Sequence, residues 1–486
     1  MRLITLAVAG LLGAQSAAFA DNVLAYHNSP ARTGSYVVPG LTLAAAAHLH
    51  MDSGFRGAVD GHVYAQPLFW HPSGGRAVVI AATESDVVEA LDAATGSLVW
   101  RRQLGEPVAL GALPCGNIDP DGITGTPVID PVAQVLYLDA ITNSASGPRH
   151  LVFALSLGDG AIVRGWPLDV GAALAARGVQ FSSAVQGERS ALTLFRGDLY
   201  LNFAGNWGDC GNYRGTVLQI HPGPPQLVAA WQTRARGGGI WAQGGLASDG
   251  QSLYATTGNT FGAQSWSDGE AIVRLEPGLA HSDDPRNFFT PANWKQLDDD
   301  DADLGGTEAL PLDIPGASRA ARIIAFGKDG NAYLADRTNL GGVGHPLAIV
   351  RVSNRAIITA PAIWPAQDGV YVALTSFGGS ICRGPNETML KVTARMDAPI
   401  VTAWCAKLDG RGAPIVTTSD GRADAIVWVV GAEGDNLLHA FDAHTGRAIF
   451  DGGNTRMAGL HHFVTIVPAE GRLYIAADKQ FFAFAF

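Results

Sequence analysis

A short element recurs along this chain and limits the folds that are open to it. The sequence LDAATGSLVW at 91–100 returns near the end as FDAHTGRAIF at 441–450. Within the element, Asp and Thr side chains suit a tight turn, Gly suits a positive φ, and the final aromatic suits packing between sheets. Looser copies begin near Leu155, Leu218, Leu275, Leu334 and Leu390, about 50–65 residues apart. This period is typical of the four-stranded blades of a β-propeller.

Short strand-like runs, punctuated by Gly, Asp and Pro, fill the rest of the chain. Seven turn elements, together with terminal strands that share one blade, predict an all-β fold: a single propeller of eight four-stranded blades over residues 21–486. Seven blades is the alternative. The final segment, 479–486, is expected to close the ring by pairing either with residues 23–26 or within its own blade. The aromatic side chains expected between neighbouring sheets are Trp100, Trp166, Trp231 and Trp404.

The first twenty residues have the pattern of a secretory signal peptide. Arg2 precedes an apolar stretch at 3–13, and Ala18-Phe-Ala20 forms a small-x-small cleavage site before Asp21. No Cys follows the apolar stretch, which disfavours a lipid anchor, and no other apolar run is long enough to span a membrane. The mature protein is therefore expected in the periplasm or outside the cell. The alternative is a buried N-terminal helix.

Composition excludes several classes of function. Asp and Glu number 44 against 33 Lys and Arg, giving a net charge of −11, and no dense basic run suggests nucleic-acid binding. The four cysteines indicate two disulfides in an exported chain, with three possible pairings. No Cys-x-x-Cys-His motif is present to attach a c-type haem, and no P-loop or dinucleotide-binding fingerprint is found.

The Asp-x-x-Thr-Gly-x-x-x-Trp element resembles the tryptophan-docking motif of quinoprotein propellers. That family includes alcohol dehydrogenases dependent on pyrroloquinoline quinone (PQQ) and non-catalytic relatives such as an outer-membrane assembly lipoprotein. The resemblance covers nearly the whole mature chain. It is specific for fold and weak for activity, because a fold does not fix a function.

Three residues resemble the cofactor and metal positions of the dehydrogenase branch. Trp241, in Gly-Ile-Trp-Ala-Gln, matches the aromatic floor under the flat quinone, and Asn259, in Thr-Gly-Asn, matches a metal ligand. Asp209 lies where the family has a metal-binding Glu, with an apparent extra residue. Alternatively, Trp241 is a packing aromatic between blades, and the other two are turn residues.

Further along, the run Asp301-Ala-Asp303 lies where the family has Asp-Tyr-Asp. The resemblance implies that Asp301 is the general base and that Asp303 is an extra ligand, as in members that use a lanthanide. Lys328, in Lys-Asp-Gly-Asn-Ala-Tyr, matches a basic residue that contacts the quinone oxygens. Three further aspartates at 298–300 make a solvated acidic loop the alternative interpretation of this run.

The cysteines depart from the family pattern. Many of the dehydrogenases close the cofactor pocket with a disulfide between adjacent cysteines, whereas this chain has the single Cys115 at the comparable position. The resemblance implies a Cys115–Cys210 bridge over the same end of the channel, which leaves Cys382–Cys405 as the second pair. Stapling of loops in an exported protein is the alternative role for both bridges.

These observations lead to two hypotheses. The first is a PQQ-dependent dehydrogenase with a Ca²⁺ or lanthanide ion, which oxidises an alcohol or similar small substrate and passes electrons to an external acceptor. The second is a non-catalytic propeller that binds a periplasmic protein partner or serves in envelope assembly. Neither hypothesis uses His461-His462, a pair more typical of core or surface histidines than of ligands.

Overall fold

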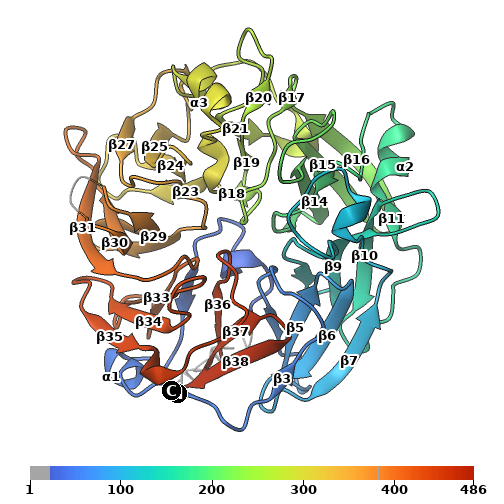
Figure 1. The fold of residues 1–486 in the computed structure, drawn as a ribbon. Helices are drawn as coiled ribbons and strands as arrows, with labels where there is room; N and C mark the ends of the chain where they lie inside the picture. The colour runs from blue at the N-terminus through green and yellow to red at the C-terminus, as the bar shows by residue number, and fades with distance from the viewer. Residues whose placement is uncertain (1–21, 380–381) are drawn as a thin grey trace, which may run out of the picture.

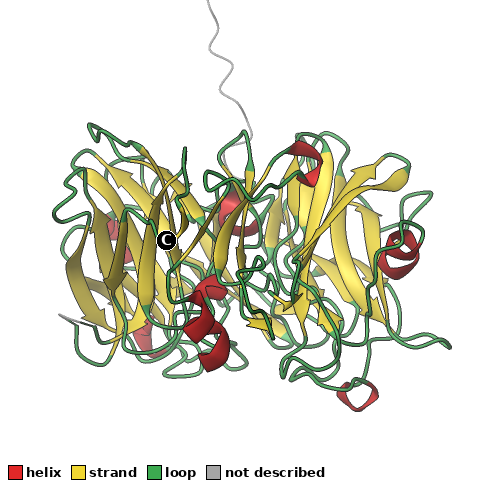
Figure 2. Cartoon of the chain, turned by 90° about the horizontal axis from the view of Figure 1, so that it is seen from above, coloured by secondary structure: helices red, strands yellow, loops and turns green. Residues whose placement is uncertain are grey.

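Eight β-sheets are arranged in a ring around one axis, as the ribbon in Figure 1 shows. The computed structural model describes residues 22–379 and 382–486. The predicted signal peptide therefore lies outside the described residues. The eight-bladed propeller expected from the repeats is confirmed. Seen from the edge in Figure 2, the strands run between two faces covered by loops.

The first four blades follow the chain, and each runs from an innermost strand at the axis to an outermost strand at the rim. Blade 1 contains β4 (Leu68–Trp70), β5 (Val78–Thr83), β6 (Val87–Asp92) and β7 (Leu98–Gln103). Blade 2 contains β8 (Val128–Asp130), β9 (Val135–Thr142), β10 (Arg149–Ser156) and β11 (Leu168–Asp169). Blade 3 contains β12 (Gln186–Gly187), β13 (Thr193–Phe195), β14 (Asp198–Gly205), β15 (Thr216–Pro222) and β16 (Pro225–Gln232). Blade 4 contains β18 (Ala247–Ser248), β19 (Leu253–Thr257), β21 (Ala271–Leu275) and β22 (Phe288–Thr290), joined by β26 (Gly342–Val343).

The other four blades complete the ring. Blade 5 contains β23 (Leu310–Asp313), β24 (Ala321–Phe326), β25 (Asn331–Asp336) and β27 (Ala348–Arg351). Blade 6 contains β28 (Ala362–Ala366), β29 (Gly369–Phe377), β30 (Pro385–Val392) and β31 (Ile400–Lys407). Blade 7 contains β32 (Ile415–Thr418), β33 (Ile426–Val430), β34 (Leu438–Asp442) and β35 (Ala448–Asp451), and blade 8 contains β36 (Ile466–Ala469), β37 (Arg472–Ala477) and β38 (Gln480–Ala485). A two-stranded sheet pairs β17 (Arg236–Gly237), which lies between blades 3 and 4 in the chain, with β20 (Thr260–Phe261), which lies between β19 and β21 of blade 4.

Helices are short. The α-helices are α1 (Leu43–Ala46), α2 (Val170–Ala175) and α3 (Trp294–Asp300). Within the described ranges, no helix has both the length and the apolar composition needed to cross a bilayer.

The ring is closed by strands from the N-terminal part of the chain. β38 pairs with β37 of its own blade, and its outer edge is covered by β2 (His50–Met51) and β3 (Gly57–Ala58). Of the two pairings expected for 479–486, the one within its own blade is therefore correct. Pairing with residues 23–26 is wrong, because Val23 instead forms a bridge to Phe69 at the inner edge of blade 1.

The centre of the ring is filled by residues 22–37, which we call the plug segment (Figure 1). It ends in β1 (Ser35–Val37), which pairs in parallel with the innermost strand of blade 7. The plug segment also bonds to the innermost strands of five other blades, so that one segment joins six blades. These contacts are Val23 with Phe69, Leu24 with Ile129, Arg32 with Thr193, Pro30 with Ser248, and Thr33 with Ile363.

The recurrent turn has the structure that its sequence predicts. In the first copy, Asp92 Oδ1 accepts hydrogen bonds from the backbone N–H groups of Ala94 and Thr95 and from the Thr95 hydroxyl. Gly96 follows with φ of +73°. Asp442 in the last copy accepts the equivalent backbone bonds. These side-chain bonds satisfy the turn and fix the direction of the next strand.

The tryptophans that end the element dock onto the next blade. Trp100 donates its indole N–H to Leu157 O at 3.0 Å, and Trp404 donates to Ala443 O at 2.8 Å. Each acceptor lies at the start of the turn element of the following blade, whose glycine is in contact with the indole ring. Trp166 and Trp231 lie in apolar clusters that likewise contain residues of the following blade. All four were expected between sheets, and this placement is confirmed.

The contact between Gly160 and Trp100 gives the first testable prediction. A Cβ at Gly160 would lie 2.5 Å from the Trp100 ring. We expect Gly160→Ala to lower the free energy of unfolding by about 1–3 kcal/mol more than Gly74→Ala. Gly74 has a similar φ, +69° against +66°, but nothing within 4 Å of its Cβ position, so it isolates the steric effect. Chemical denaturation followed by circular dichroism measures both variants, and equal losses would contradict docking at this contact.

Candidate active site

One buried carboxylate, Asp303, organises the candidate site. The side chain of Asp303 is 2% exposed, and its Oδ2 accepts the indole N–H of Trp241 at 3.0 Å. The same oxygen lies 2.7 Å from Lys328 Nζ, and that ammonium lies 5.3 Å from the centre of the Trp241 ring. Asp303 therefore fixes the orientation of both the aromatic and the basic residue that the sequence singled out.

Lys328 also pairs with the second aspartate of the run. Its Nζ lies 2.8 Å from Asp301 Oδ1, and the Asp301 side chain is 64% exposed. Asp301 follows α3 in the left-handed conformation, with φ of +51°. Burial acts to lower the pKa of Lys328, but the charges of Asp303 and Asp301 outweigh burial and raise the pKa above its usual value. The ammonium therefore stays charged between the two carboxylates.

Asn259 lies against Asp303 through its backbone. Its N–H donates to Asp303 Oδ1 at 2.8 Å, and its side chain is largely buried. A Cβ at Gly258 would lie 2.8 Å from the same oxygen, so this close approach of the chain requires glycine. Both oxygens of Asp303 are thus engaged by protein donors. The ligand role predicted for Asp303 stays a prediction.

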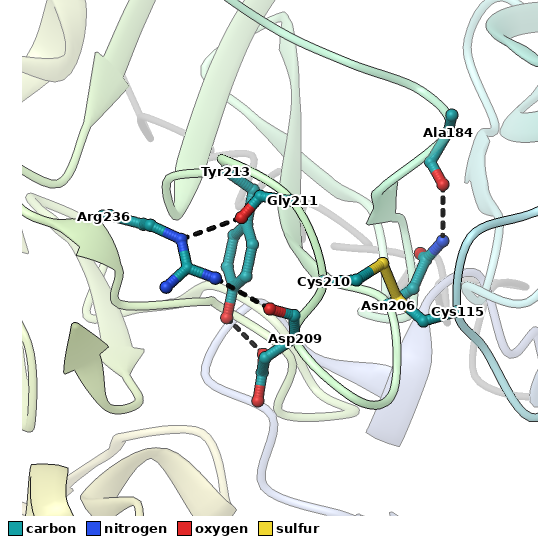
Figure 3. The surroundings of a disulfide bond; sticks show 8 residues. All are labelled: Cys115, Ala184, Asn206, Asp209, Cys210, Gly211, Tyr213 and Arg236. Atoms are coloured by element: carbon teal, nitrogen blue, oxygen red, sulfur yellow. Dashed lines mark hydrogen bonds between the residues drawn. A yellow bond between two sulfur atoms is a disulfide. The ribbon is translucent and has the colours of Figure 1, made fainter.

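Asp209 lies in the loop between β14 and β15, where Tyr213 and Arg236 hold it in place (Figure 3). The Tyr213 hydroxyl donates to Asp209 Oδ1, and Arg236 donates to the backbone carbonyls of Asp209 and Gly211, both at 2.8 Å. Burial raises the pKa of the Asp209 carboxyl. The Tyr213 hydrogen bond opposes that rise, whereas the negative charges of Asp303 and Asp301 add to it. The charges of Asp301 and Asp303 therefore make Asp209 harder to ionise.

The disulfides join the predicted pairs of cysteines. Cys115 is bonded to Cys210, with Cα atoms 6.0 Å apart, and Cys382 is bonded to Cys405, with Cα atoms 5.8 Å apart. The first bridge directly follows Asp209 in the chain and lies beside Asn206 in Figure 3. The second belongs to blade 6. Both predicted pairings are confirmed.

Two adjoining cavities lie beside Trp241 and the first disulfide. The smaller, of about 30 Å³, is lined by Trp241 and by residues next to the first disulfide, including Gly116 and Asn206. The larger has a volume of about 200 Å³. The smaller has room for about one water molecule, so a larger ligand at Trp241 requires side chains to move. The residues that line both cavities are Asn117, Ile118, Thr124 and Arg189.

Arg189 is a basic residue of these cavities that the sequence analysis missed. The hydrogen bond found for its guanidinium among the described residues is one to Asn117 Oδ1, at 3.5 Å. A guanidinium has five N–H donors in a planar fork, so most of them remain available. Arg189 therefore offers a binding group for an anion inside the cavities.

The buried acids Glu84 and Asp86, in the turn between β5 and β6, were also missed. Glu84 Oε2 accepts from the Gly122 N–H at 2.8 Å, and burial raises the pKa of this carboxyl well above its usual value. Burial, followed by the charges of Asp139 and Asp121, raises the pKa of Asp86 to about 8. The signal in the sequence is weak: Glu84 and Asp86 lie between two apolar strands, a common position for turn residues.

The candidate residues thus come from three neighbouring blades. One bonded group is centred on Asp303 and contains Trp241, Asn259 and Lys328. Within the described residues, Asp301 contacts this group only through Lys328, and Asp209 makes no bond to it. The charges of Asp301 and Asp303 nevertheless act on the Asp209 carboxyl. The connections that carry these residues are those of blades 3, 4 and 5. The arrangement offers an oriented indole that lines the smaller cavity, a charged ammonium beside that indole, and an exposed carboxylate on the ammonium.

Comparison with solved structures identifies the type of propeller. Quinohemoprotein alcohol dehydrogenase from Comamonas testosteroni superposes with a TM-score of 0.69 at 15% identity, over 96% of this chain and 81% of the other. A europium-containing methanol dehydrogenase gives 0.66 at 12% identity, over 94% and 89%. This chain has the fold of the quinoprotein dehydrogenases.

A non-dehydrogenase propeller is also similar. BamB from Moraxella catarrhalis superposes with a TM-score of 0.54 at 16% identity, over 90% of this chain and 100% of that protein. No family model matches the sequence. No curated protein matches it either. At these identities, the likeness shows the fold and leaves the activity to be argued from the site.

Proposed function

We propose that this chain is an exported dehydrogenase that binds PQQ beside Trp241 and oxidises a small alcohol or similar substrate. The observation that carries the proposal is the bonding of Trp241 and Lys328 to the single carboxylate of Asp303. This arrangement gives a flat cofactor an oriented aromatic surface and places a positive charge near the ring.

The lining of the cavities carries both signs of charge: Asp121, Glu188 and Glu433 are acidic, and Arg189 supplies the guanidinium for an anionic quinone. The Arg189 guanidinium has N–H donors available for a carboxylate of the quinone, and Asn117 and Thr124 add polar groups to the lining. Because the space beside Trp241 is about 30 Å³, PQQ has to displace neighbouring side chains. Trp207 lines this cavity and is 65% exposed, so its indole can move without disturbing the core.

Asp209, Asn259 and Asp303 are the residues proposed to hold a Ca²⁺ or lanthanide ion. Carboxylate and amide oxygens are the ligands that hard cations prefer. The ammonium of Lys328 already lies against Asp303, so the ion and the lysine have to share that carboxylate. When bound, PQQ supplies the two-electron acceptor and the ion polarises it.

Asp301 is proposed as the general base that receives the proton of the substrate hydroxyl. Its carboxylate is exposed and has Lys328 as its one hydrogen-bond partner among the described residues, so a substrate can reach it. The sequence has no c-type haem motif, so electrons are expected to leave to an external acceptor. The signal-like pattern at 1–20 supports a periplasmic or secreted location.

A second candidate function is a non-catalytic module that binds a protein partner during envelope assembly. The likeness to BamB and the small volume beside Trp241 favour this alternative. It predicts that PQQ with Ca²⁺ or a lanthanide ion leaves both the absorbance and the dye-linked oxidation activity of the purified protein unchanged. The dehydrogenase proposal predicts a bound quinone spectrum and oxidation of added alcohols.

Substitution of Trp241 tests the proposed cofactor position. Trp241→Ala removes the stacking surface, and we expect it to weaken PQQ binding at least about tenfold, measured by equilibrium dialysis. Trp241→Phe retains an aromatic surface but loses the bond to Asp303, and should bind with intermediate affinity. Trp294→Ala, at the start of α3, is the control and should bind as the wild type does. Equal binding by all variants would place PQQ elsewhere.

A further inference from the structure

Three metal-ligating side chains converge outside the proposed PQQ site. His62 lies between β3 and β4, His461 lies before β36, and Asp478 lies in the turn between β37 and β38. His62 Nδ1 lies 2.8 Å from Asp478 Oδ2, and His461 Nε2 lies 2.8 Å from Asp478 Oδ1. The three ligand atoms all lie within 4.8 Å of one another. We call this group the His-His-Asp cluster.

The backbone holds the three loops of the cluster together. Val63 N–H donates to Asp478 Oδ1 at 3.2 Å, Lys479 N–H donates to Gly61 O at 2.9 Å, and Asp478 N–H donates to Gly459 O at 2.9 Å. A Cβ at Gly459 would lie 2.8 Å from Asp478 Cβ, so glycine is needed for this approach. The positions of the ligands are therefore fixed by main-chain bonds as well as by their own contacts.

The two imidazoles are the ion-pair partners of Asp478 among the described residues. Among the described residues, no Lys or Arg pairs with Asp478. His62 Nδ1 lies against Asp478 Oδ2, and His461 Nε2 lies against Asp478 Oδ1, each at 2.8 Å. Asp478 is therefore an anionic oxygen ligand flanked by two imidazole nitrogens.

We propose that the His-His-Asp cluster binds a divalent transition-metal ion of the zinc type. Two imidazoles and one carboxylate are a common ligand set for such ions, and three protein ligands leave a fourth position open. Zinc binds these atoms at about 2.0–2.2 Å, so the three ligand atoms, which lie within 4.8 Å of one another, have to close around the ion when it binds. This proposal goes beyond the dehydrogenase activity and does not depend on PQQ.

The binding step balances in protons. Without metal, the neutral tautomers that suit the carboxylate carry their proton on Nδ1 of His62 and on Nε2 of His461, the two nitrogens nearest to Asp478. When zinc binds, each of these protons moves through water to the other nitrogen of the same ring, so that a lone pair is free for the ion and no net proton is released. His62 is 41% exposed, so water can accept a hydrogen bond from its Nε2.

The cluster lies beside the larger cavity. His461 lines this cavity, and its ring stacks on that of Tyr64, also a lining residue, with centroids 4.1 Å apart. The stacking fixes the plane of the imidazole that has to face the metal. The site differs from the proposed Ca²⁺ ligands, which offer oxygen only, because soft and borderline ions prefer imidazole.

Zinc titration of untagged, chelator-treated protein tests the proposal. In competition with a chromophoric chelator, the wild type is expected to bind about one Zn²⁺ per chain. We expect His62→Ala and Asp478→Asn each to lower the affinity by about 100-fold or more, since even residues behind metal ligands contribute about 10–100-fold. The matched control is His439→Ala, because His439 pairs with Asp435 at 3.0 Å without a third ligand.

Two further readouts keep the test decisive. Co²⁺ in place of Zn²⁺ should give visible absorption bands that disappear in His461→Gln, and circular dichroism checks that each variant is folded. Asp209→Asn should bind Zn²⁺ as the wild type does, which separates this site from the proposed PQQ and Ca²⁺ site. Absence of Zn²⁺ binding to the wild type, or equal affinity in His62→Ala, would overturn the proposal whether or not the protein oxidises alcohols.

Discussion

Replacing Asp301 by Asn is expected to lower the rate of dye-linked alcohol oxidation by about 10²–10⁴-fold, the usual contribution of a general base. PQQ binding should be unchanged, because Asp301 contacts Lys328 rather than the aromatic surface. The exposed position of Asp301 means that the fold tolerates the change. Steady-state kinetics of the protein loaded with PQQ and Ca²⁺ measures the rate, and equilibrium dialysis measures the binding.

Asp299→Asn is the matched control for this experiment. Asp299 lies on the same helix end, is 63% exposed and pairs with Lys295, a lysine outside the site. Its substitution should leave both rate and PQQ binding as in the wild type. A full rate in Asp301→Asn, with an active wild type, would mean that another group removes the proton. Asp303→Asn would then be the next variant to test.

Replacing Arg32 by Met is expected to lower the free energy of unfolding by about 3–5 kcal/mol, as for other broken buried charge networks. Arg32 is 1% exposed, and its guanidinium donates to Leu192 O at 2.9 Å and to Thr193 Oγ1 at 2.7 Å. It also donates to Tyr26 O and Leu246 O. Removal of the guanidinium takes a donor from Tyr26 O and Leu192 O inside the protein, whereas Leu246 O keeps the Thr193 hydroxyl as its donor.

The loss in Arg32→Met should depend on pH, because Glu308 is the buried acid whose charge Arg32 balances. Burial raises the pKa of Glu308 from 4.5 to about 7 against the opposing effect of Arg32. The folded protein keeps a proton that the unfolded chain loses, so this group lowers stability as pH rises from 4.5 to about 7. Without Arg32 the Glu308 pKa rises further, and the deficit should be larger at about pH 8 than at about pH 5.

Chemical denaturation at both pH values measures this effect. Arg76→Met is the control, because the Arg76 side chain is 63% exposed and lies 3.5 Å from its partner Asp92. It should change the stability by less than about 1 kcal/mol. A similarly small loss in Arg32→Met would show that the plug segment contributes little to the stability of the ring.

The fold was predictable because its signal is local and repeated. In the first and last copies of the turn element, an Asp accepts hydrogen bonds within its own turn. The Trp that ends the element docks on the next blade, as Trp100 and Trp404 do. The number of copies therefore predicts the number of blades to within one. Closure of the ring was not predictable to the same degree. The partners of β38 are residues 50–51 and 57–58, more than 400 positions away, and no local pattern marks them.

The sequence predicted which residues form the candidate site, but not how buried each one is or which groups it contacts. The run 298–303 contains five aspartates whose surroundings differ widely. Asp298 binds the Thr260 hydroxyl and N–H, Asp301 is mostly exposed, and Asp303 is buried against Trp241. These differences arise from the end of α3, where a single left-handed residue redirects the chain. Arg189 and Glu84 were missed because burial inside the channel leaves no periodic signal.

The position of the plug segment has a consequence for how the chain assembles. Residues 22–37 are made before every blade, yet their docking sites lie on strands as late in the chain as β32, nearly 400 residues downstream. Docking of the segment cannot be complete until the chain has made its first seven blades, because β32 belongs to blade 7. Contacts between such distant parts of a chain form slowly, because the intervening loop has to close first. Insertion of the plug segment is therefore expected among the last folding events, and a bulky group fused directly before residue 22 should delay it.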